Sequence, residues 1–507
     1  MELSLILLTI LTGLIGYFIH SLYKSRSYWQ SLGIPCEEPH LIFGNLKGVQ
    51  LTRGFWEIWE DYYRRFKGTG PFAGFYWFFK PAVFVLDPEL IKNILIKDFQ
   101  NFPDRGFFHN EQDDPLSGQL FLLEGLKWKQ MRQKLSPTFT SGKMKFMFPT
   151  VTQVAKEMIG VLGNLVDEKE GSVVEIKELM ARFTTDVIGT CAFGIECSSL
   201  KDPNAEFRVM GSRSLVEHKH NRLIIGFMIS CCELARKLHM KQTPDDIEEF
   251  FMRIVRETVE YREKNNIRRN DFMDMLIDLK NKKLIKSEHG DELTNLTLEE
   301  IAAQAFVFFN AGFETSSTTL SFALYELAKH PEVQDRARKE VMEKLDKYQG
   351  ELSYECMKEM TYLEQILMET LRLYTVLPVL NRVALEDYVV PQNPKYVIKK
   401  GMQIIIPSGA IHRDERYYPK PQEFNPDNFS PEKVAARDSV LFLGFGEGPR
   451  NCIGLRFGKM EATIGLALLL QHFKFSVCEK TQIPLTYGKV SYLIGTDKGV
   501  YLKVEKV

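Results

Sequence analysis

The chain has 507 residues with 65 basic and 66 acidic side chains, and this balanced charge gives no support to a nucleic-acid partner. Its eight cysteines are scattered without a CxxC pair, which argues against a secreted disulfide scaffold and is typical of free thiols in a reducing compartment. A chain of this length holds about three average domains or folds around one large core, and composition leaves both open.

The first predicted element is a membrane anchor over residues 1–23. The run from Leu3 to Tyr23 carries no formal charge, and about 20 helical residues cross a hydrocarbon core of about 30 Å. A cleaved signal peptide would carry positive charge before the apolar run, whereas here Glu2 precedes it and Lys24 and Arg26 follow it. We therefore expect an uncleaved anchor, with the rest of the chain on the cytosolic side.

A basic flank and a hinge are predicted next, over residues 24–48, where Pro35 and Pro39 restrict the backbone. From residue 49 to residue 507 the chain has no repeat, no low-complexity segment and no linker that would divide it. The simplest interpretation of residues 49–507 is one large, mainly α domain with minor β-sheets.

Helical spacing dominates from about residue 143 to residue 380. The most informative helix begins after Thr297, which forms a capping-box pattern with Glu300. No proline interrupts this pattern before Pro331, so about 32 residues could form one helix of roughly 48 Å. Short strands are predicted at residues 81–87, 388–406 and 488–504.

The middle of this long helix contains the sequence AGFET, residues 311–315. Gly312 costs about 1 kcal/mol relative to alanine in a helix, and Glu314 stands among several phenylalanines. A glycine and a charged residue are both unfavourable in the middle of an apolar helix, and their presence indicates a functional position. The alternative is that Gly312 only allows close packing and that Glu314 faces solvent.

The sequence FGEGPRNCIG, residues 445–454, has three competing interpretations. A phosphate-binding loop would need a preceding strand and the Walker lysine spacing, which is missing. A nucleophilic cysteine would need a histidine base, but His412 and His472 stand in no recognisable signature. In the third interpretation Cys452 is a thiolate metal ligand at a helix N-terminus, the glycines let the backbone approach a flat cofactor, and Arg450 offers positive charge to its acid groups.

This loop resembles the signature F-x-x-G-x-R-x-C-x-G of the haem-thiolate cytochromes P-450. The fixed positions are occupied by Phe445, Gly448, Arg450, Cys452 and Gly454. The resemblance extends over essentially the whole chain, through the sequences WKQMR, AGFET and ETLR in the same order and at similar separations. It implies a mainly α cytochrome P-450 fold with minor β-sheets, as a single large domain behind the N-terminal membrane anchor.

The resemblance also implies a haem b cofactor, iron protoporphyrin IX, with Cys452 as the thiolate ligand of the iron. Thr315 and Glu314 would be catalytic, with the Thr315 hydroxyl holding a water and Glu314 relaying protons to it, in a helix that bulges at Gly312. The implied haem-binding side chains, mainly donors to the propionates, are Trp128, Arg132, Arg382, Arg450, Phe445 and Arg105.

An ion pair between Glu369 and Arg372 in ETLR would brace the cysteine loop, as in the family. The alternative is a solvated helix face. The family usually has an arginine where this chain has Asn428, which can donate an amide to Glu369 but carries no charge. We therefore expect a weaker brace and an unchanged fold.

The function implied by the resemblance is monooxygenation of lipophilic substrates, with electrons passed from NADPH through the flavins of NADPH–cytochrome P-450 reductase and cytochrome b5 as a second candidate partner. Residues 180–208 are similar to insect microsomal members that handle xenobiotics, insecticides and hormones, which implies the endoplasmic reticulum membrane. The alternatives are a haem-thiolate isomerase or dehydratase that needs no reductase, and a haem-based sensor. The pair Glu314 and Thr315 favours the monooxygenase.

Two surfaces follow from this interpretation. An acidic reductase could dock against lysines near the haem, namely Lys127, Lys129, Lys134 and Lys143. The substrate pocket would be lined by largely apolar segments, namely residues 107–120, 223–234, 306–312, 376–380 and 490–493. Residues 223–232 could also enter the lipid headgroup region.

Overall fold

The computed structural model describes residues 5, 6, 9, 12, 13, 16, 23–281, 285, 286, 292, 293 and 295–507. The predicted anchor at residues 1–23 lies mostly outside these described residues. None of the helices that the described residues form combines the length and the apolar character needed to cross a bilayer.

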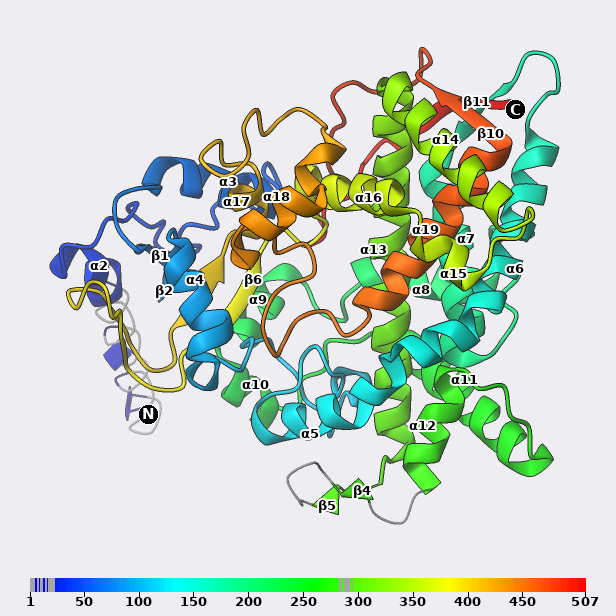
Figure 1. Cartoon of the computed structure of the whole chain (residues 1–507). Helices are drawn as coiled ribbons and strands as arrows, with labels where there is room; N and C mark the ends of the chain where they lie inside the picture. The colour runs from blue at the N-terminus through cyan, green and yellow to red at the C-terminus, as the bar shows by residue number, and fades with distance from the viewer. Residues whose placement is uncertain are drawn as a thin grey trace.

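Helices make up most of the described fold, as predicted (Figure 1). They are α2 (Tyr28–Ser31), α3 (Phe55–Phe66), α4 (Pro88–Lys92), α5 (Gly125–Leu135), α6 (Ser141–Leu165), α7 (Ile176–Ile188), α8 (Glu206–Val216), α9 (Arg222–Ser230), α10 (Cys232–Lys237), α11 (Asp245–Asn265), α12 (Phe272–Asn281), α13 (Leu298–Lys329), α14 (Pro331–Lys347), α15 (Tyr354–Lys358), α16 (Thr361–Leu373), α17 (Ser408–His412), α18 (Pro431–Ala436) and α19 (Leu455–His472).

The strands are short and form minor sheets, also as predicted. They are β1 (Phe72–Trp77), β2 (Lys80–Val85), β3 (Ser172–Glu175), β4 (Ile285–Lys286), β5 (Glu292–Leu293), β6 (Leu380–Val383), β7 (Tyr388–Val389), β8 (Val397–Ile398), β9 (Gln403–Ile406), β10 (Phe473–Ser476) and β11 (Tyr501–Lys506). The strand predicted at 81–87 is confirmed as β2, and β7, β8 and β9 lie within 388–406. The strand predicted at 488–504 is wrong before residue 501, because there only Thr496 forms an isolated bridge, with Tyr487.

The largest sheet has the strand order β1-β2-β9-β6. Strands β2 and β9 are parallel, and the other neighbours are antiparallel. Every residue of β1 is buried, because the chain covers both of its faces. Trp29, from the segment predicted as a hinge, packs on β1 and donates its indole N–H to the Phe75 carbonyl at 3.0 Å.

Helix α13 is the longest element, with 32 residues. The predicted capping box is confirmed, because the Thr297 hydroxyl accepts from the Glu300 N–H at 3.1 Å and the Glu300 carboxylate accepts from the Thr297 N–H at 3.0 Å. In Figure 1 the four-stranded sheet and α3 lie on one side of α13, and α6, α7, α11 and α14 lie on the other.

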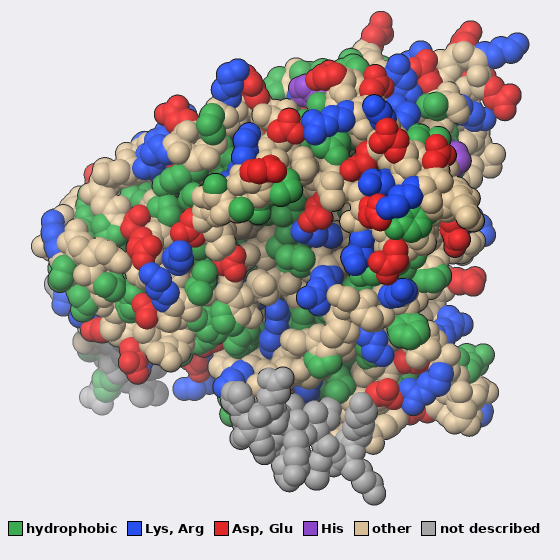
Figure 2. Space-filling model, in the orientation of Figure 1, with side chains coloured by type: hydrophobic (Ala, Val, Ile, Leu, Met, Phe, Trp, Pro, Cys, Tyr) green, Lys and Arg blue, Asp and Glu red, His purple; other side chains and the backbone are tan. Residues whose placement is uncertain are grey.

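The apolar core also has two parts, one among the helices and one around the four-stranded sheet. One large buried cluster is formed by helices α6, α7, α11, α13, α16 and α19, and a second surrounds the four-stranded sheet with α3 and α4. On the face in Figure 2, basic and acidic side chains are interspersed, in keeping with a net charge of −1.

Candidate active site

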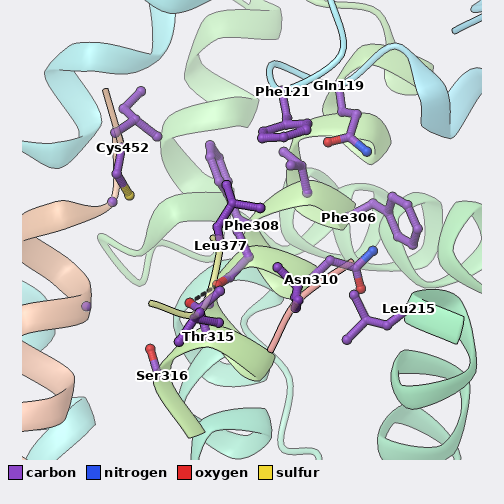
Figure 3. A pocket seen from close by; sticks show the side chains of 18 of the residues that line it. Gln119, Phe121, Leu215, Phe306, Phe308, Asn310, Thr315, Ser316, Leu377 and Cys452 are labelled. Carbon is purple, nitrogen blue, oxygen red and sulfur yellow. Dashed lines mark hydrogen bonds between the residues drawn. The ribbon is translucent and has the colours of Figure 1, made fainter. Parts of the chain in front are cut away.

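A cavity of about 620 Å³ lies between α13, the segments 105–122 and 376–382, and the loop that carries Cys452. Its volume is within the range of about 300 to 1,000 Å³ that small-molecule sites occupy. Apolar and aromatic side chains form most of its wall, among them Phe121, Phe306, Phe308 and Leu377 (Figure 3). The cavity can therefore hold an apolar ligand.

Four of the five segments predicted to line the pocket do so, namely 107–120, 306–312, 376–380 and 490–493. The fifth, 223–234, contributes only Ile229. The sequence interpretation missed the wall formed by residues 188–192, 214–218 and 242–247. These residues reach the cavity because α7, α8 and α11 pack beside α13, an arrangement that local sequence patterns do not encode.

The cysteine loop takes its shape from glycines in the left-handed region, with φ of +69° at Gly446 and +75° at Gly448. A side chain at Gly448 would also collide with the Leu95 carbonyl. The Cys452 N–H donates to the Phe445 carbonyl at 2.8 Å, and the side chain faces the cavity just before α19 begins (Figure 3).

The thiol of Cys452 is open to the cavity although it lies deep in the protein. Burial raises its pKa, whereas the Gly454 N–H and the positive charges of Arg132 and Arg105 lower it. A bound metal ion would deprotonate a thiol in this position outright. The residue is thus suited to metal ligation.

Three arginines, Arg105, Arg382 and Arg450, contribute to the cavity wall. The Nε atoms of Arg382 and Arg450 are buried and have no hydrogen-bond partner among the described residues. Burial and, next, the charge of Arg450 lower the pKa of Arg382 to about 9, and burial lowers that of Arg450 to about 10. Such a cluster of cations is stabilised by an anionic ligand.

Trp128 and Arg132 lie behind the cavity wall rather than in it. The Arg450 guanidinium lies 4.7 Å from the centre of the Trp128 ring. Arg132 donates to the Asn451 backbone carbonyl at 2.9 Å and to its side-chain oxygen at 2.8 Å. Both side chains therefore support the cysteine loop directly.

Thr315 lines the cavity, and its hydroxyl donates to the Ala311 carbonyl at 2.5 Å (Figure 3). The expected bulge at Gly312 is wrong, because α13 continues as regular α-helix through this residue. A side chain at Gly312 would collide with Ile188 of α7. The close-packing alternative therefore accounts for this glycine.

Glu314 lies outside the cavity wall and is only partly exposed. Its carboxylate accepts from Lys177 Nζ at 2.9 Å and from the Thr318 hydroxyl at 3.2 Å. Lys177 also donates to the Ser317 hydroxyl at 2.8 Å. The sequence interpretation missed Lys177, because a lysine 137 positions away gives no local signal.

Comparison with known proteins decides the family, because the family model named Cytochrome P450 matches residues 34–504. The chain belongs to the cytochrome P450 family. "Probable cytochrome P450 6a21" of Drosophila melanogaster is 64% identical to this P450 over 507 residues, which is 100% of each chain. "Cytochrome P450 6a9" of the same species is 64% identical over 502 residues, 99% of each chain. "Cytochrome P450 6A1" of Musca domestica is 50% identical over 503 residues, 99% of this chain and 97% of that relative.

The resemblance to cytochromes P-450 and to insect members is thereby confirmed, and the chain is a haem-thiolate P450 monooxygenase, an oxidoreductase. The residues of the cavity fit a haem. The Cys452 thiol faces the cavity, and the wall contains buried Nε donors of Arg382 and Arg450 that have no partner among the described residues, as a macrocycle with two carboxylates would need.

The predicted brace of this P450 is confirmed and buried, since Glu369 and Arg372 are both 0% exposed. Their two bonds measure 2.7 and 2.8 Å. Asn428 donates its amide to Glu369 at 3.2 Å, as expected, and Arg372 also donates to the carbonyl of His412 at 2.9 Å. The His412 ring accepts from the Leu443 N–H at 2.7 Å, which links the brace to the cysteine loop.

Glu461, on α19, is another buried acid, and the sequence interpretation missed it. It is 0% exposed, and neither of its carboxylate oxygens has a hydrogen-bond partner among the described residues. Burial raises its pKa to about 8. This carboxyl therefore remains mostly protonated at neutral pH.

Proposed function

We propose that this P450 inserts one oxygen atom of O2 into lipophilic substrates, with xenobiotics, insecticides and hormones as the candidate classes. The observation that carries the proposal is the Cys452 thiol facing a largely apolar cavity whose wall also includes Thr315. Such a wall favours apolar ligands and excludes most water.

In this proposal Cys452 would hold the haem iron as thiolate, and Phe445, which lies in the cavity wall, would help to hold the cofactor. The implied donors to the propionates are Trp128, Arg132, Arg382, Arg450 and Arg105. Bound haem would supply the activation of dioxygen and the transfer of one oxygen atom to the substrate.

Thr315 and Glu314, the proposed catalytic pair, would have different roles. Because the Thr315 hydroxyl uses its proton on the Ala311 carbonyl, its lone pairs remain to accept a hydrogen bond from a cavity water. Glu314, joined to Lys177 outside the wall, would take up protons and pass them toward that water. An isomerase, a dehydratase or a sensor would need neither task.

The proposed partners are NADPH–cytochrome P-450 reductase and cytochrome b5. Lys127 and Lys129 on α5 are exposed, and the opposite face of this helix carries Trp128. An acidic partner could therefore approach the haem closely at α5. Lys134 is 7% exposed, so the expectation that it belongs to this docking surface is wrong.

We also propose residence in the endoplasmic reticulum membrane, with the domain from residue 49 to residue 507 facing the cytosol. Within the anchor at residues 1–23, Glu2 precedes the apolar run, and the basic flank of the segment 24–48 follows it. Leu223 on α9 is 70% exposed and offers a second contact with lipid. Removal of residues 1–24 should therefore release the protein only partly from the membrane fraction, and sequencing of the mature N-terminus would reveal any cleavage that contradicts an anchor.

The proposed chemistry is tested by two measurements. Reduced protein under carbon monoxide should show the red-shifted Soret band of a thiolate ligand, and Cys452→His should lose that band even where haem remains bound. Turnover of a lipophilic substrate should require both reductase and NADPH. Retention of the band in the variant would place the ligand elsewhere, and turnover without reductase would favour the isomerase or dehydratase.

A further inference from the structure

The apolar wall of the cavity is interrupted by an amide and a hydroxyl that bond to each other. Asn310 on α13 and Ser214 on α8 both line the cavity. The Ser214 Oγ lies 2.7 Å from the Asn310 Oδ1. An amide inside an apolar wall is costly unless its hydrogen-bonding groups find partners.

The position of this pair is fixed by close packing of the two helices. Gly211, one turn before Ser214, has no space for a side chain, because a Cβ there would collide with the Phe309 ring of α13. The Ser214 hydroxyl also lies 2.7 Å from the Gly211 carbonyl. The hydroxyl is thus held between two acceptors and has only one proton.

The position of the Ser214 proton determines which hydrogen-bonding groups of the Asn310 amide remain available to a ligand. With the Ser214 proton on Oδ1, one lone pair of the Asn310 oxygen is used, and its Nδ2 retains two N–H donors. Nδ2 has no acceptor within hydrogen-bond distance among the residues that the structure describes. These donors are therefore available to a ligand.

Asn310 also lies apart from the proposed reacting end of the cavity. In Figure 3 it stands with Phe306 and Leu215, whereas Cys452 and Thr315 lie on the other side of the view. Asn310 and Thr315 are five positions apart in the helix, a rise of about 7.5 Å along the axis. A ligand bonded to Asn310 would thus direct its apolar body toward Thr315.

We propose that Asn310 is a specificity-determining residue whose amide N–H, oriented by Ser214, donates to one oxygen acceptor of an otherwise apolar substrate. The inference rests on the proposed binding of lipophilic substrates and narrows it to molecules that carry a carbonyl, ether or hydroxyl oxygen away from the carbon to be oxidised. One such bond is worth roughly a 3- to 10-fold gain in affinity.

Three rigid aromatic probes of nearly equal shape test the proposal: fluorene without a polar group, fluorenone with an acceptor, and carbazole with a donor only. Their dissociation constants are measured by equilibrium dialysis against the purified, haem-loaded full chain. We expect fluorenone to bind roughly 3 to 10 times more tightly than fluorene. The infrared carbonyl band of bound fluorenone should also move to lower frequency.

The variant Asn310→Leu keeps the branched shape of the side chain but removes the amide, so it should abolish both the discrimination and the infrared shift while fluorene remains bound. Asn265→Leu, an exposed change at the end of α11, is the matched control and should alter neither. Equal binding of fluorenone and fluorene by the unmodified protein, or tighter binding of carbazole than of fluorenone, would overturn the proposed role of Asn310. Either result would leave the proposed binding of lipophilic substrates unaffected. Failure of all three probes to bind would overturn the role of Asn310 together with the proposed lipophilic substrates.

Discussion

Replacement of Glu369 by alanine should prevent stable haem incorporation, because it leaves the Arg372 cation buried without its counter-ion. Both side chains are 0% exposed, and the substitution deletes two charge-assisted bonds of 2.7 and 2.8 Å. It also removes the acceptor of the Asn425 N–H at 2.9 Å and of the Asn428 amide at 3.2 Å. Arg372 would keep only neutral carbonyl acceptors, and the Asn425 N–H and the Asn428 amide would lose the acceptor that Glu369 provides.

The expected magnitude follows from these contacts. A buried charge stripped of its partner costs about 3 to 5 kcal/mol, and a buried donor without an acceptor adds about 1 to 3 kcal/mol. These terms are not additive, but a loss of at least about 4 kcal/mol is expected against a domain stability of about 5 to 15 kcal/mol. The Soret absorbance per protein and the midpoint of denaturant unfolding measure the loss.

The matched control is Glu355→Ala. Glu355 and Lys358 have the same three-residue spacing in an exposed pair, with 52% and 59% of the side chains exposed. We expect this control to change the free energy of unfolding by no more than about 1 kcal/mol. The double variant with Arg372→Met should be less destabilised than Glu369→Ala alone, because it removes the orphaned charge. Normal haem content in Glu369→Ala, or a loss no larger than in the control, would refute the reasoning.

Thr315→Ala should lower the ratio of product to NADPH consumed and raise the yield of hydrogen peroxide, whereas an unchanged ratio would mean that the hydroxyl only bonds to the helix. Asn428→Arg should keep the haem content and raise the free energy of unfolding by up to about 1 kcal/mol, because a charged donor replaces a neutral one beside Glu369; loss of haem would contradict this. The raised pKa of Glu461, about 8 in the fold against an ordinary value of 4.5, means that the folded protein keeps a proton that the unfolded chain releases. The free energy of unfolding should therefore fall by up to about 1.4 kcal/mol per pH unit between pH 4.5 and 8, and Glu461→Gln should remove that part of the slope while Glu260→Gln, an exposed control, should not.

Local sequence patterns were sufficient to predict features that are formed by residues close together in the sequence. The Thr297 capping box fixes the start of α13, and the glycines around Cys452 fix a loop that turns the thiol toward the cavity. The family signature also led to Glu369 and Asn428, which meet in the fold although 59 positions separate them.

Residues joined only by packing were not predictable. Lys177 reaches Glu314, and Ser214 reaches Asn310, because α7 and α8 pack against α13. No spacing in the sequence records these contacts. The bulge expected at Gly312 failed for the same reason, since the need for glycine comes from Ile188 on another helix.

The apolar interior is divided into a helical cluster and a sheet cluster. This division affects how readily substitutions can change the range of substrates that the protein binds. The cavity lies where these two clusters meet, so a side chain in its wall faces the ligand-binding space on one side. Truncation of such a side chain enlarges a space that already exists, whereas truncation inside either cluster creates a new void that costs about 2 to 5 kcal/mol for a leucine. The shape of the pocket is therefore largely uncoupled from the stability of the fold, and successive substitutions can alter the substrate while leaving the scaffold intact.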